Sequence, residues 1–278
     1  MRKFFLSIAI GLAVSTAVPT PLQAHGPVFS PAPETIFKGG TQLTVGVDTE
    51  RAAGAGVEEK EYKAFLEAEY GITSDWEVGI VIPFTQKEEN SLTASGLGDI
   101  AVDTKYQFWK RDVLGAQYKA AAFLQFELPI GDDDSRPRLG SGSTDVITGL
   151  ATGYEGRRWY WFASGAYRMN TEGEGGLEKG DKQFLNIVGG VRPILSEYDE
   201  PDTVLMLELN WERAGRDELN GATLSNTGGW TLFLSPVVWL TYRQAALRGG
   251  VQIPISETLN GNQPDTDYRT RVELVYHF

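Results

Sequence analysis

The sequence contains no cysteine and only two histidines, His25 and His277. Disulfides therefore cannot stabilise the fold, and a metal site built from thiolates or from several imidazoles is excluded. Long apolar runs are missing as well. The longest, FFLSIAIGLAV at positions 4–14, is about half of the ~20 residues that a membrane-spanning helix needs. A helical membrane protein is therefore not expected.

The first 24 residues have the three parts of an export signal. Arg2 and Lys3 precede the apolar run, and the small-residue stretch TAVPTPLQA follows it. We expect a signal peptide over residues 1–24, cleavage after Ala24, and an exported chain that starts at His25. Positive charge is scarce: without Arg2 and Lys3, 23 Lys and Arg stand against 37 Asp and Glu. Nucleic acid is therefore not an expected partner.

The exported part alternates between apolar and polar residues with a period of two, which predicts β-strands. In DIAVDTKYQFWK, for example, Ile100, Val102 and Tyr106 share one face, and Asp103 and Lys105 share the other. Most of the predicted strands have 10 to 14 residues, which matches the ~9 to 11 residues of a tilted strand that crosses a bilayer. Twelve are predicted, near residues 40–49, 61–71, 76–84, 99–110, 120–130, 143–155, 157–170, 182–194, 204–212, 229–242, 244–256 and 266–278.

The connections between these strands alternate between short and long. The short ones lie at residues 71–75, 110–116, 155–158, 196–202 and 243–245, and the long, charged ones at 49–61, 85–96, 131–142, 171–182, 212–228 and 256–267. Outer-membrane barrels have short periplasmic turns and long outer loops. The alternative is a large exported β-sandwich. Against it, the apolar faces carry aromatic residues near strand ends, as barrel girdles do: Trp76, Phe84, Tyr106, Phe108, Trp211, Trp230, Tyr242 and Tyr276.

We therefore predict an all-β protein, a transmembrane antiparallel up-and-down β-barrel of about 12 strands in the bacterial outer membrane. The predicted division is a signal peptide (1–24), an extended N-terminal segment (25–38) and the barrel (39–278). The last strand has to pair with the first to remove the sheet edges. The terminal VYHF resembles the terminal-phenylalanine signature that the barrel assembly machinery reads, so Tyr276 and Phe278 are the predicted assembly signal.

Four segments carry a wider resemblance: HGPVFSPAPETIFKGG at the exported start, SGLGDIAVDTKYQFW, LPIGDDDSRPRLGSGSTD and LSPVVWLTYR. They resemble the outer-membrane transporter-like family named for a role in the meta pathway of phenol degradation. The resemblance covers nearly all of residues 25–278 and implies passage of small solutes, with aromatic compounds suggested by the family name. It implies no catalytic residues. Expected partners are outer-membrane lipids, lipopolysaccharide, the assembly machinery and a small-molecule solute; no cofactor is expected.

If the apolar faces meet lipid, the polar faces line a lumen. The predicted lumen and selectivity residues are Glu67, Glu69, Glu77, Asp99, Asp103, Lys105, Glu127, Asp145, Arg168, Arg192, Glu208, Glu212, Arg248, Arg271 and Glu273, with Gln125, Asn210 and Gln252 beside them. Ten carboxylates face five cations in this set. One interpretation is a passive, hydrated channel that favours cations or neutral polar solutes. The other is a structural barrel whose lumen is closed by salt bridges.

A third interpretation is a lipid-modifying enzyme. It needs a base near the outer leaflet, but His277 is predicted at the periplasmic rim, and GSGS at 140–143 lacks the context of a nucleophile elbow. No catalytic residue is therefore assigned. The α-amine and imidazole of His25 could hold Cu(II). The Pro-rich stretch Pro27 to Pro33 is expected to run along the rim or to fold into the lumen as a plug. The acidic segment 131–140 is expected to be a solvated outer loop.

Overall fold

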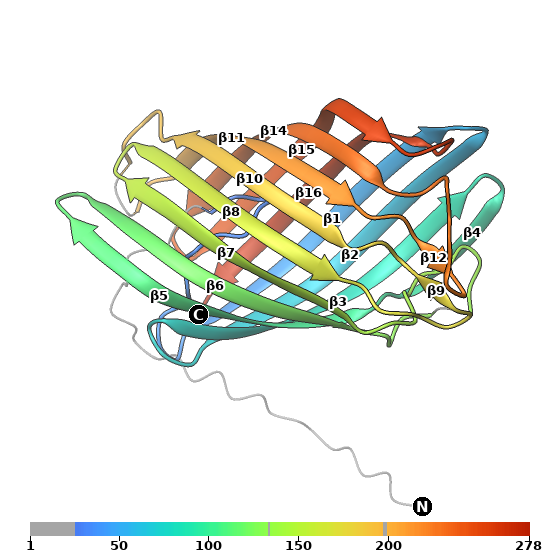
Figure 1. The fold of residues 1–278 in the computed structure, drawn as a ribbon. Coiled ribbons are helices and arrows are strands. Elements are labelled where there is room, and N and C mark those ends of the chain that lie inside the picture. Colours follow the sequence, from blue (N-terminus) through green and yellow to red (C-terminus); the bar gives the residue numbers. More distant parts are fainter. Residues whose placement is uncertain (1–25, 133, 197–198) are drawn as a thin grey trace, which may run out of the picture.

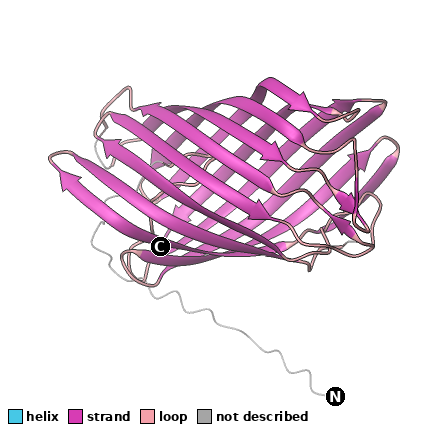
Figure 2. Cartoon of the chain, viewed as in Figure 1, coloured by secondary structure: helices cyan, strands magenta, loops and turns pink. Residues whose placement is uncertain are grey.

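The computed structural model describes residues 26–132, 134–196 and 199–278. The predicted signal peptide and His25 lie outside these ranges. The described chain forms strands and loops (Figure 2), and it contains no helix long and apolar enough to cross a membrane. The strands are β1 (Thr41–Gly54), β2 (Val57–Gly71), β3 (Trp76–Glu89), β4 (Leu92–Leu97), β5 (Ile100–Val113), β6 (Ala116–Leu128), β7 (Asp145–Gly156), β8 (Trp159–Met169), β9 (Leu177–Glu178), β10 (Lys182–Val191), β11 (Asp202–Ala214), β12 (Glu218–Leu219), β13 (Ala222–Thr223), β14 (Gly229–Tyr242), β15 (Ala245–Leu259) and β16 (Asp265–His277).

Twelve long strands close into a tilted antiparallel barrel (Figure 1). Each long strand pairs with its neighbours along the chain, and β16 pairs with β1 from Gln42↔His277 to Ala53↔Asp265. The backbone N–H of Phe278 adds a hydrogen bond to the Thr41 carbonyl at 2.9 Å. Closure satisfies the backbone groups that an open edge would leave exposed to lipid. The predicted fold class, including the strand number, is confirmed.

The connections separate the barrel into two ends. Short turns join β2 to β3, β5 to β6, β7 to β8 and β14 to β15, and the C-terminus lies at the same end (Figure 1). We call it the turn end. The opposite end carries the longer connections and the short strands β4, β9, β12 and β13, of which the last three form a small separate sheet. We call it the loop end.

Two of the six predicted long loops are instead strand extensions. In the segments 49–61 and 85–96, β1 pairs with β2 as far as Gly54↔Val57, and β3 pairs with β4 as far as Glu89↔Leu92. The β1–β2 connection is a two-residue turn whose Ala55 and Gly56 have φ of 53° and 81°, the region that tight hairpin turns require. These extensions lack an apolar face and are held partly by ion pairs, so their alternation does not show in the hydrophobic pattern.

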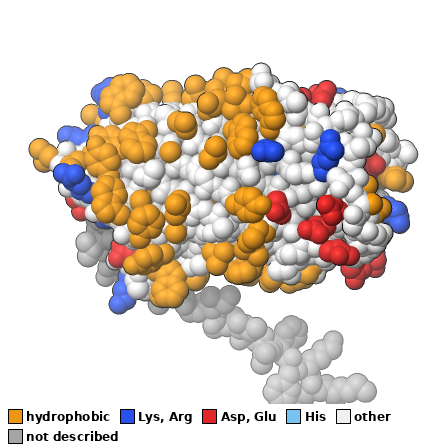
Figure 3. Space-filling view, in the orientation of Figure 1, with side chains coloured by type: hydrophobic (Ala, Val, Ile, Leu, Met, Phe, Trp, Pro, Cys, Tyr) orange, Lys and Arg blue, Asp and Glu red, His pale blue; other side chains and the backbone are white. Residues whose placement is uncertain are grey.

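Apolar side chains cover the outside of the barrel. Along β1 the exposed Val45 and Val47 alternate with inward residues, and Leu274 on β16 is 56% exposed. Hydrophobic side chains spread over much of the surface in Figure 3, while acidic ones gather toward the loop end. Of the eight aromatic residues predicted for the girdles, six are exposed and two, Trp211 and Trp230, are half-buried. The outer surface therefore suits lipid.

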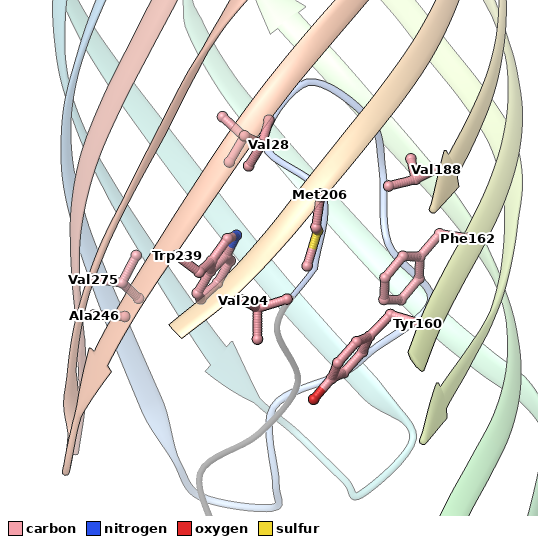
Figure 4. Packing of buried hydrophobic residues seen from close by; sticks show 10 residues of the cluster. Val28, Tyr160, Phe162, Val188, Val204, Met206, Trp239, Ala246 and Val275 are labelled. Atoms are coloured by element: carbon pink, nitrogen blue, oxygen red, sulfur yellow. The ribbon is translucent and has the colours of Figure 1, made fainter. Parts of the chain in front are cut away.

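An apolar cluster fills part of the lumen near the turn end (Figure 4). Its members come from the inner faces of six strands and from the N-terminal segment: Val28, Tyr160, Phe162, Val188, Val204, Met206, Val237, Trp239, Ala246 and Val275. Burial of each large apolar side chain stabilises the fold by about 1.5–3 kcal/mol. Val28 is the member that does not belong to the wall, so the cluster also fixes the N-terminal segment inside the barrel.

Candidate functional site

The lumen is partly occupied by the N-terminal segment, residues 26–40, which we call the plug segment. Of the two placements considered for the Pro-rich stretch, the structure shows the one inside the lumen. The segment enters the barrel, reaches the inner face of β11, and returns toward the turn end, where Gly40 leads into β1. Proline suits this path because the segment pairs with no strand, so missing N–H donors cost little.

Glu208 on β11 is the first anchor of the plug segment. Its Oε1 accepts hydrogen bonds from the backbone N–H of Val28 at 2.7 Å and of Phe29 at 3.2 Å, and its Oε2 accepts one from the Ser30 hydroxyl at 2.5 Å. Asn210, two residues along the same inner face, donates to the Ser30 hydroxyl at 2.9 Å. Asn210 also donates to Glu208 Oε2 at 3.3 Å, and a buried carboxylate that accepts four hydrogen bonds makes up for its lost hydration with these partners.

Glu77 on β3 is the second anchor. Its Oε2 accepts a hydrogen bond from the backbone N–H of Ile36 at 2.7 Å, and its Oε1 lies 2.6 Å from Lys105 Nζ. Lys105 also donates to the Glu34 carbonyl at 2.8 Å, and Gln107 donates to the Pro33 carbonyl at 3.0 Å. Polar contacts from β3, β5 and β11 thus hold the segment from two sides of the lumen.

Glu34 is the charged side chain that the plug segment contributes. Its Oε1 lies 3.8 Å from Lys119 Nζ on β6, and Lys119 in turn lies 2.7 Å from Glu155 Oε2 on β7. Neither Glu34 carboxylate oxygen has a hydrogen-bond partner among the described residues. Burial raises the pKa of Glu34 to about 7; Glu155 adds to the rise, while Lys119 and Lys105 oppose it.

A chamber of about 1020 Å³ extends along the lumen from Arg138 and Ser141 at the loop end, beside the plug segment, to Gln42 and His277 near the turn end. Its acidic lining residues are Glu34, Asp48, Glu50, Glu61, Glu67, Glu69, Glu77, Asp99, Asp103, Glu127, Glu212 and Glu273. Its cationic lining residues are Lys63, Lys87, Lys105, Arg138, Arg168, Lys179, Lys182, Arg248, Arg269 and Arg271. Twelve acidic side chains thus face ten cationic ones, a smaller acidic excess than the ten against five expected from the sequence.

Arginines of β15 and β16 form a column along one wall of the chamber. Arg271 holds Asp48 with two hydrogen bonds of 2.6 and 2.8 Å, Arg269 lies 2.9 Å from Glu212, and Arg248 pairs with Glu273. The three guanidinium groups also stack on Phe65, Phe233 and Trp239, at 5.6, 4.8 and 4.9 Å from the ring centroids. Gly46 makes room for this packing, since a Cβ there would collide with the Phe65 ring.

Two acidic side chains of the chamber are free of such partners. Within the described ranges, Glu67 on β2 and Asp103 on β5 have neither a hydrogen bond nor an ion pair through their carboxylates. Asp103 lies over Gly79 of β3, where a Cβ would meet its carboxylate, so it leans toward β2 and toward Glu69. Unpaired carboxylates on the wall of a chamber need water or a cation.

Twelve of the fifteen predicted lumen residues line the chamber, and three do not. Asp145 is fully buried beneath Arg168, at 2.7 Å, and Glu208 is fully buried against the plug segment. Arg192 lies instead at a pocket of the turn end and pairs with Asp202 at 3.0 Å. Arg192 is the first residue after β10, which ends at Val191, and its guanidinium lies over the ring of the inward-facing Tyr160 at 5.6 Å.

The sequence interpretation left out several lumen residues, among them Asp48, Lys119, Glu155 and Arg269. Strand parity could have found them. Arg269 shares the inner face of β16 with Arg271, and Lys119 shares that of β6 with Gln125. The apolar Phe123 between Lys119 and Gln125 obscured the polar face of β6, since it also points into the chamber.

The loop after β6 is held against the loop end of the barrel near its two ends, while Asp132, Asp134, Arg136 and Arg138 are exposed, in agreement with the expected solvated loop. Asp99, which follows the Gly98 bulge between β4 and β5, accepts hydrogen bonds from the backbone N–H of Gly131 at 3.0 Å and of Ser141 at 2.6 Å. Leu139 is buried, and Arg138 donates to the Glu174 carbonyl of the next loop at 3.0 Å. The GLGD segment therefore anchors a loop that narrows the chamber mouth.

The copper site predicted at His25 and the assembly signal predicted at Tyr276 and Phe278 are separate from the predicted lumen residues. Within the described part of the chain, no group of three or more His, Asp or Glu side chains is arranged to hold a metal ion. The copper site proposed for His25 lies outside that part. Tyr276 and Phe278 are exposed at the turn end, with ring centroids 4.7 Å apart in an edge-to-face arrangement. Their role in assembly stays a prediction.

Comparison with solved structures identifies the same architecture in bacterial outer-membrane proteins. An outer membrane channel from Pseudomonas putida F1 superposes with a TM-score of 0.73 at 15% identity, covering 91% of this chain and 100% of that one. The β domain of the Bordetella autotransporter BrkA gives 0.52 at 12% identity, covering 86% and 99%. The NanC porin gives 0.50 at 10% identity, covering 84% and 98%. At these identities the likeness shows the fold.

A search of curated proteins found no match. A family model, in contrast, matches residues 32–194, which is more than half of the chain and includes most of the plug segment, the GLGD segment and the strands from β1 to β10. The resemblance stated from the sequence is thereby confirmed. The chain belongs to the family described as "Putative MetA-pathway of phenol degradation".

Proposed function

We propose that the protein is a passive channel of the outer membrane for small polar solutes, with its lumen narrowed by the plug segment. The observation that carries the proposal is the chamber of about 1020 Å³, whose charged walls lead from the loop end to a segment bound by polar side-chain contacts and not by strand pairing. A charged lumen that has room for water and small solutes, inside a lipid-facing barrel, suits solute passage. The barrels it resembles include proteins named as a channel and a porin.

The proposed orientation places the turn end in the periplasm and the loop end outside the cell. Outer-membrane barrels carry their short turns and both termini on the periplasmic side. The apolar outer surface and its exposed aromatic residues support a position across the bilayer. A solute then enters past the loop anchored on Asp99, crosses the chamber, and meets the plug segment last.

The lining supports small cations or neutral polar molecules as solutes. The chamber has a small acidic excess, and its unpaired carboxylates, Glu67 and Asp103, lie on the wall available to a solute. Along the arginine column, Arg248, Arg269 and Arg271 are already paired with carboxylates and offer anions no free guanidinium. The family name supports aromatic solutes. A polar aromatic molecule agrees with both the charged lining of the chamber and the family name.

A structural barrel with a closed lumen is the second candidate. Two buried carboxylates and an apolar cluster hold the plug segment, and many chamber charges are paired. An enzyme has less support. The one histidine within the described ranges, His277, is part of the chamber wall at the strand that leads to the turn end, far along the barrel from the GSGS segment of the loop end.

Liposome swelling tests the proposal. Vesicles that contain the refolded protein are diluted into isotonic solutions of neutral sugars of increasing size, and a variant that lacks residues 26–36 is treated in the same way. We expect slow swelling with the full protein and faster swelling with the variant, limited to small sugars in both. Heat-modifiable migration on gels verifies that each barrel is folded. A folded variant that causes no swelling contradicts a channel and favours the structural barrel.

A further inference from the structure

A second pocket lies at the turn end, beside the β5–β6 and β7–β8 turns. Its volume is about 490 Å³, and its lining includes Gln117 on β6, Glu155 on β7, Tyr160 on β8 and Arg192. Glu34 of the plug segment is one of the lining residues of the chamber. Glu34, Lys119 and Glu155 form a chain of charged groups that connects the linings of the two cavities.

Lys119 bridges the two cavities through its charge. Its Nζ lies 2.7 Å from Glu155, which lines the turn-end pocket, and 3.8 Å from Glu34, which lines the chamber. Its side chain is 10% exposed. A lysine side chain has several rotatable bonds and carries a compact charge, so it can shift between two carboxylates without any backbone movement.

The plug segment is bound unevenly around its circumference. Glu208 and Glu77 accept its backbone N–H groups at 2.7 Å, and Lys105 and Gln107 donate to its carbonyls at 2.8 and 3.0 Å. Toward β6 and β7 the contact is the 3.8 Å approach of Lys119 to Glu34, beyond hydrogen-bond distance. The buried Glu34 oxygens stay unsatisfied, which is unfavourable.

We propose that solutes leave the chamber beside the seated plug segment, through a seam between Glu34 and strands β6 and β7, and that Lys119 is the residue that closes this seam. The proposal rests on the channel function. It also names a solute class: small cations and N–H donors, which can bind the Glu34 oxygens, unsatisfied among the described residues, while Lys119 stays paired with Glu155. The plug segment then acts as one wall of the path and stays in place during transport.

The charged groups that face Glu34 agree with such a seam. They are Lys105 from β5, Lys119 from β6 and Glu155 from β7. Because burial raises the pKa of Glu34 to about 7, its neutral and charged forms are both populated near neutral pH. Loss of the Glu34 charge leaves Lys119 with Glu155 alone and removes the charge pair that spans the seam.

The test fixes the plug segment and asks whether current remains. Since the chain has no cysteine, the variant Ser30→Cys with Asn210→Cys carries one possible crosslink, between side chains that are 2.9 Å apart in the native protein. The pair is closed by oxidation or by a short thiol-specific crosslinker, and mass spectrometry verifies closure. We expect the crosslinked protein to keep the conductance of its reduced form. Loss of current on crosslinking, with recovery by reductant, overturns the proposal.

Substitution of Lys119 in the crosslinked background completes the test. Lys119→Gln should raise single-channel conductance about twofold, and Lys119→Arg should leave it near the starting value, because the charge that closes the seam is kept. Lys182→Gln is the matched control, since Lys182 pairs with Glu212 at 2.9 Å on the chamber wall away from the seam. An equal rise with Lys182→Gln overturns the proposal.

The outcomes separate this inference from the channel function itself. A channel whose plug segment has to leave the lumen conducts without residues 26–36 and loses current when crosslinked, which refutes the seam alone. A folded barrel that conducts neither with residues 26–36 nor without them refutes the channel function and, with it, the seam.

Discussion

Glu208 concentrates three hydrogen-bond donors of the plug segment on one buried carboxylate. Its substitution by Gln keeps the shape and removes the charge. Hydrogen bonds to a charged group contribute about 1 kcal/mol more than neutral ones, so we expect the plug segment to be held about 1–2 kcal/mol more weakly. Amide hydrogen exchange of the peptide over residues 26–40 should then be roughly tenfold faster.

The matched control for this experiment is Glu67→Gln. Glu67 lies in the same lumen but contacts no residue of the plug segment by a hydrogen bond or ion pair within the described ranges. Its substitution should leave exchange of the plug peptide unchanged. Equal acceleration by both variants would show that lumen charge in general, and not the Glu208 anchor, holds the segment.

Glu34 predicts a pH dependence of plug binding. Its pKa is raised to about 7 when the segment is seated, above its ordinary value of 4.5, so the seated state binds protons more tightly than the released one. The contribution of Glu34 to seating is therefore most favourable below pH 4.5 and is lost as pH rises through 7. Glu34→Gln should protect the plug peptide from exchange more than the native chain does at pH 8.

Measurement of the two proteins at the same pH removes the intrinsic pH dependence of exchange. At pH 5 the native and Glu34→Gln chains should exchange at more similar rates than at pH 8. Glu34 is then mostly protonated in the seated native segment, and the amide of the variant is always uncharged. A difference of equal size at pH 5 and pH 8 would mean that Glu34 keeps an ordinary pKa in the seated segment.

At the scale of elements, the bulge after β4 positions a loop. Gly98 donates its backbone N–H to the Pro83 carbonyl at 3.0 Å, and the following Asp99 holds Gly131 and Ser141. We expect Asp99→Ala to release the loop after β6, because two backbone donors lose their acceptor. Limited proteolysis of intact cells or vesicles should then cut this loop faster, with the barrel itself still heat-modifiable.

Asp132→Ala is the control for the loop. Asp132 contributes its backbone to contacts with Leu97, Leu139 and Gly140, while its side chain has no hydrogen bond or ion pair among the described residues. Proteolysis of this variant should match the native rate. If Asp99→Ala is cut no faster than Asp132→Ala, the Asp99 contacts do not hold the loop in the membrane.

The elements also show how far the sequence could be interpreted. All twelve spanning strands could be located because their outward faces meet lipid and alternate strictly, as in β16 with Val272 and Leu274. The part of the β1–β2 hairpin between residues 50 and 60 could not, because charged and small residues occupy both of its faces and no apolar period remains. The burial of Leu139 within an otherwise exposed loop could not be predicted, since it depends on Asp99, 40 residues earlier.

The lumen residues, like the strands, could be predicted only where local alternation determines them. Parity within strands placed Glu67, Asp103 and Arg271 in the lumen, because it depends on local geometry alone. The plug segment has no period, and its position depends on carboxylates of β3 and β11 that are distant in sequence. Ion pairing decides which charged side chains of the lumen stay free. Ion pairs between strands depend on how neighbouring strands are aligned, and this register could not be derived from the sequence.

At the scale of the whole molecule, barrel closure depends on the last strand. β16 pairs with both β1 and β15, and Phe278 is exposed beside Tyr276 at the turn end. If the assembly machinery reads these residues, Phe278→Ala should lower the amount of barrel in the outer membrane of cells. Refolding of the purified variant in detergent should be unaffected, because the ladder of β1 and β16 is intact.

Leu114→Ala controls for the loss of an exposed apolar side chain at the same end, since Leu114 lies in the turn between β5 and β6. This variant should reach the outer membrane in normal amounts. Equal loss of both variants, or defective refolding of Phe278→Ala in detergent, would show that Phe278 acts through stability and not as an assembly signal.

The whole molecule combines a lipid-facing surface, a charged chamber and a bound plug segment, and the central claim is that this combination conducts. Single-channel recording of the exported chain in a planar bilayer under a salt gradient tests it most directly. The account predicts small openings with a reversal potential that favours cations, and larger, steadier ones without residues 26–36. A folded, heat-modifiable barrel that stays silent with and without those residues would contradict the account.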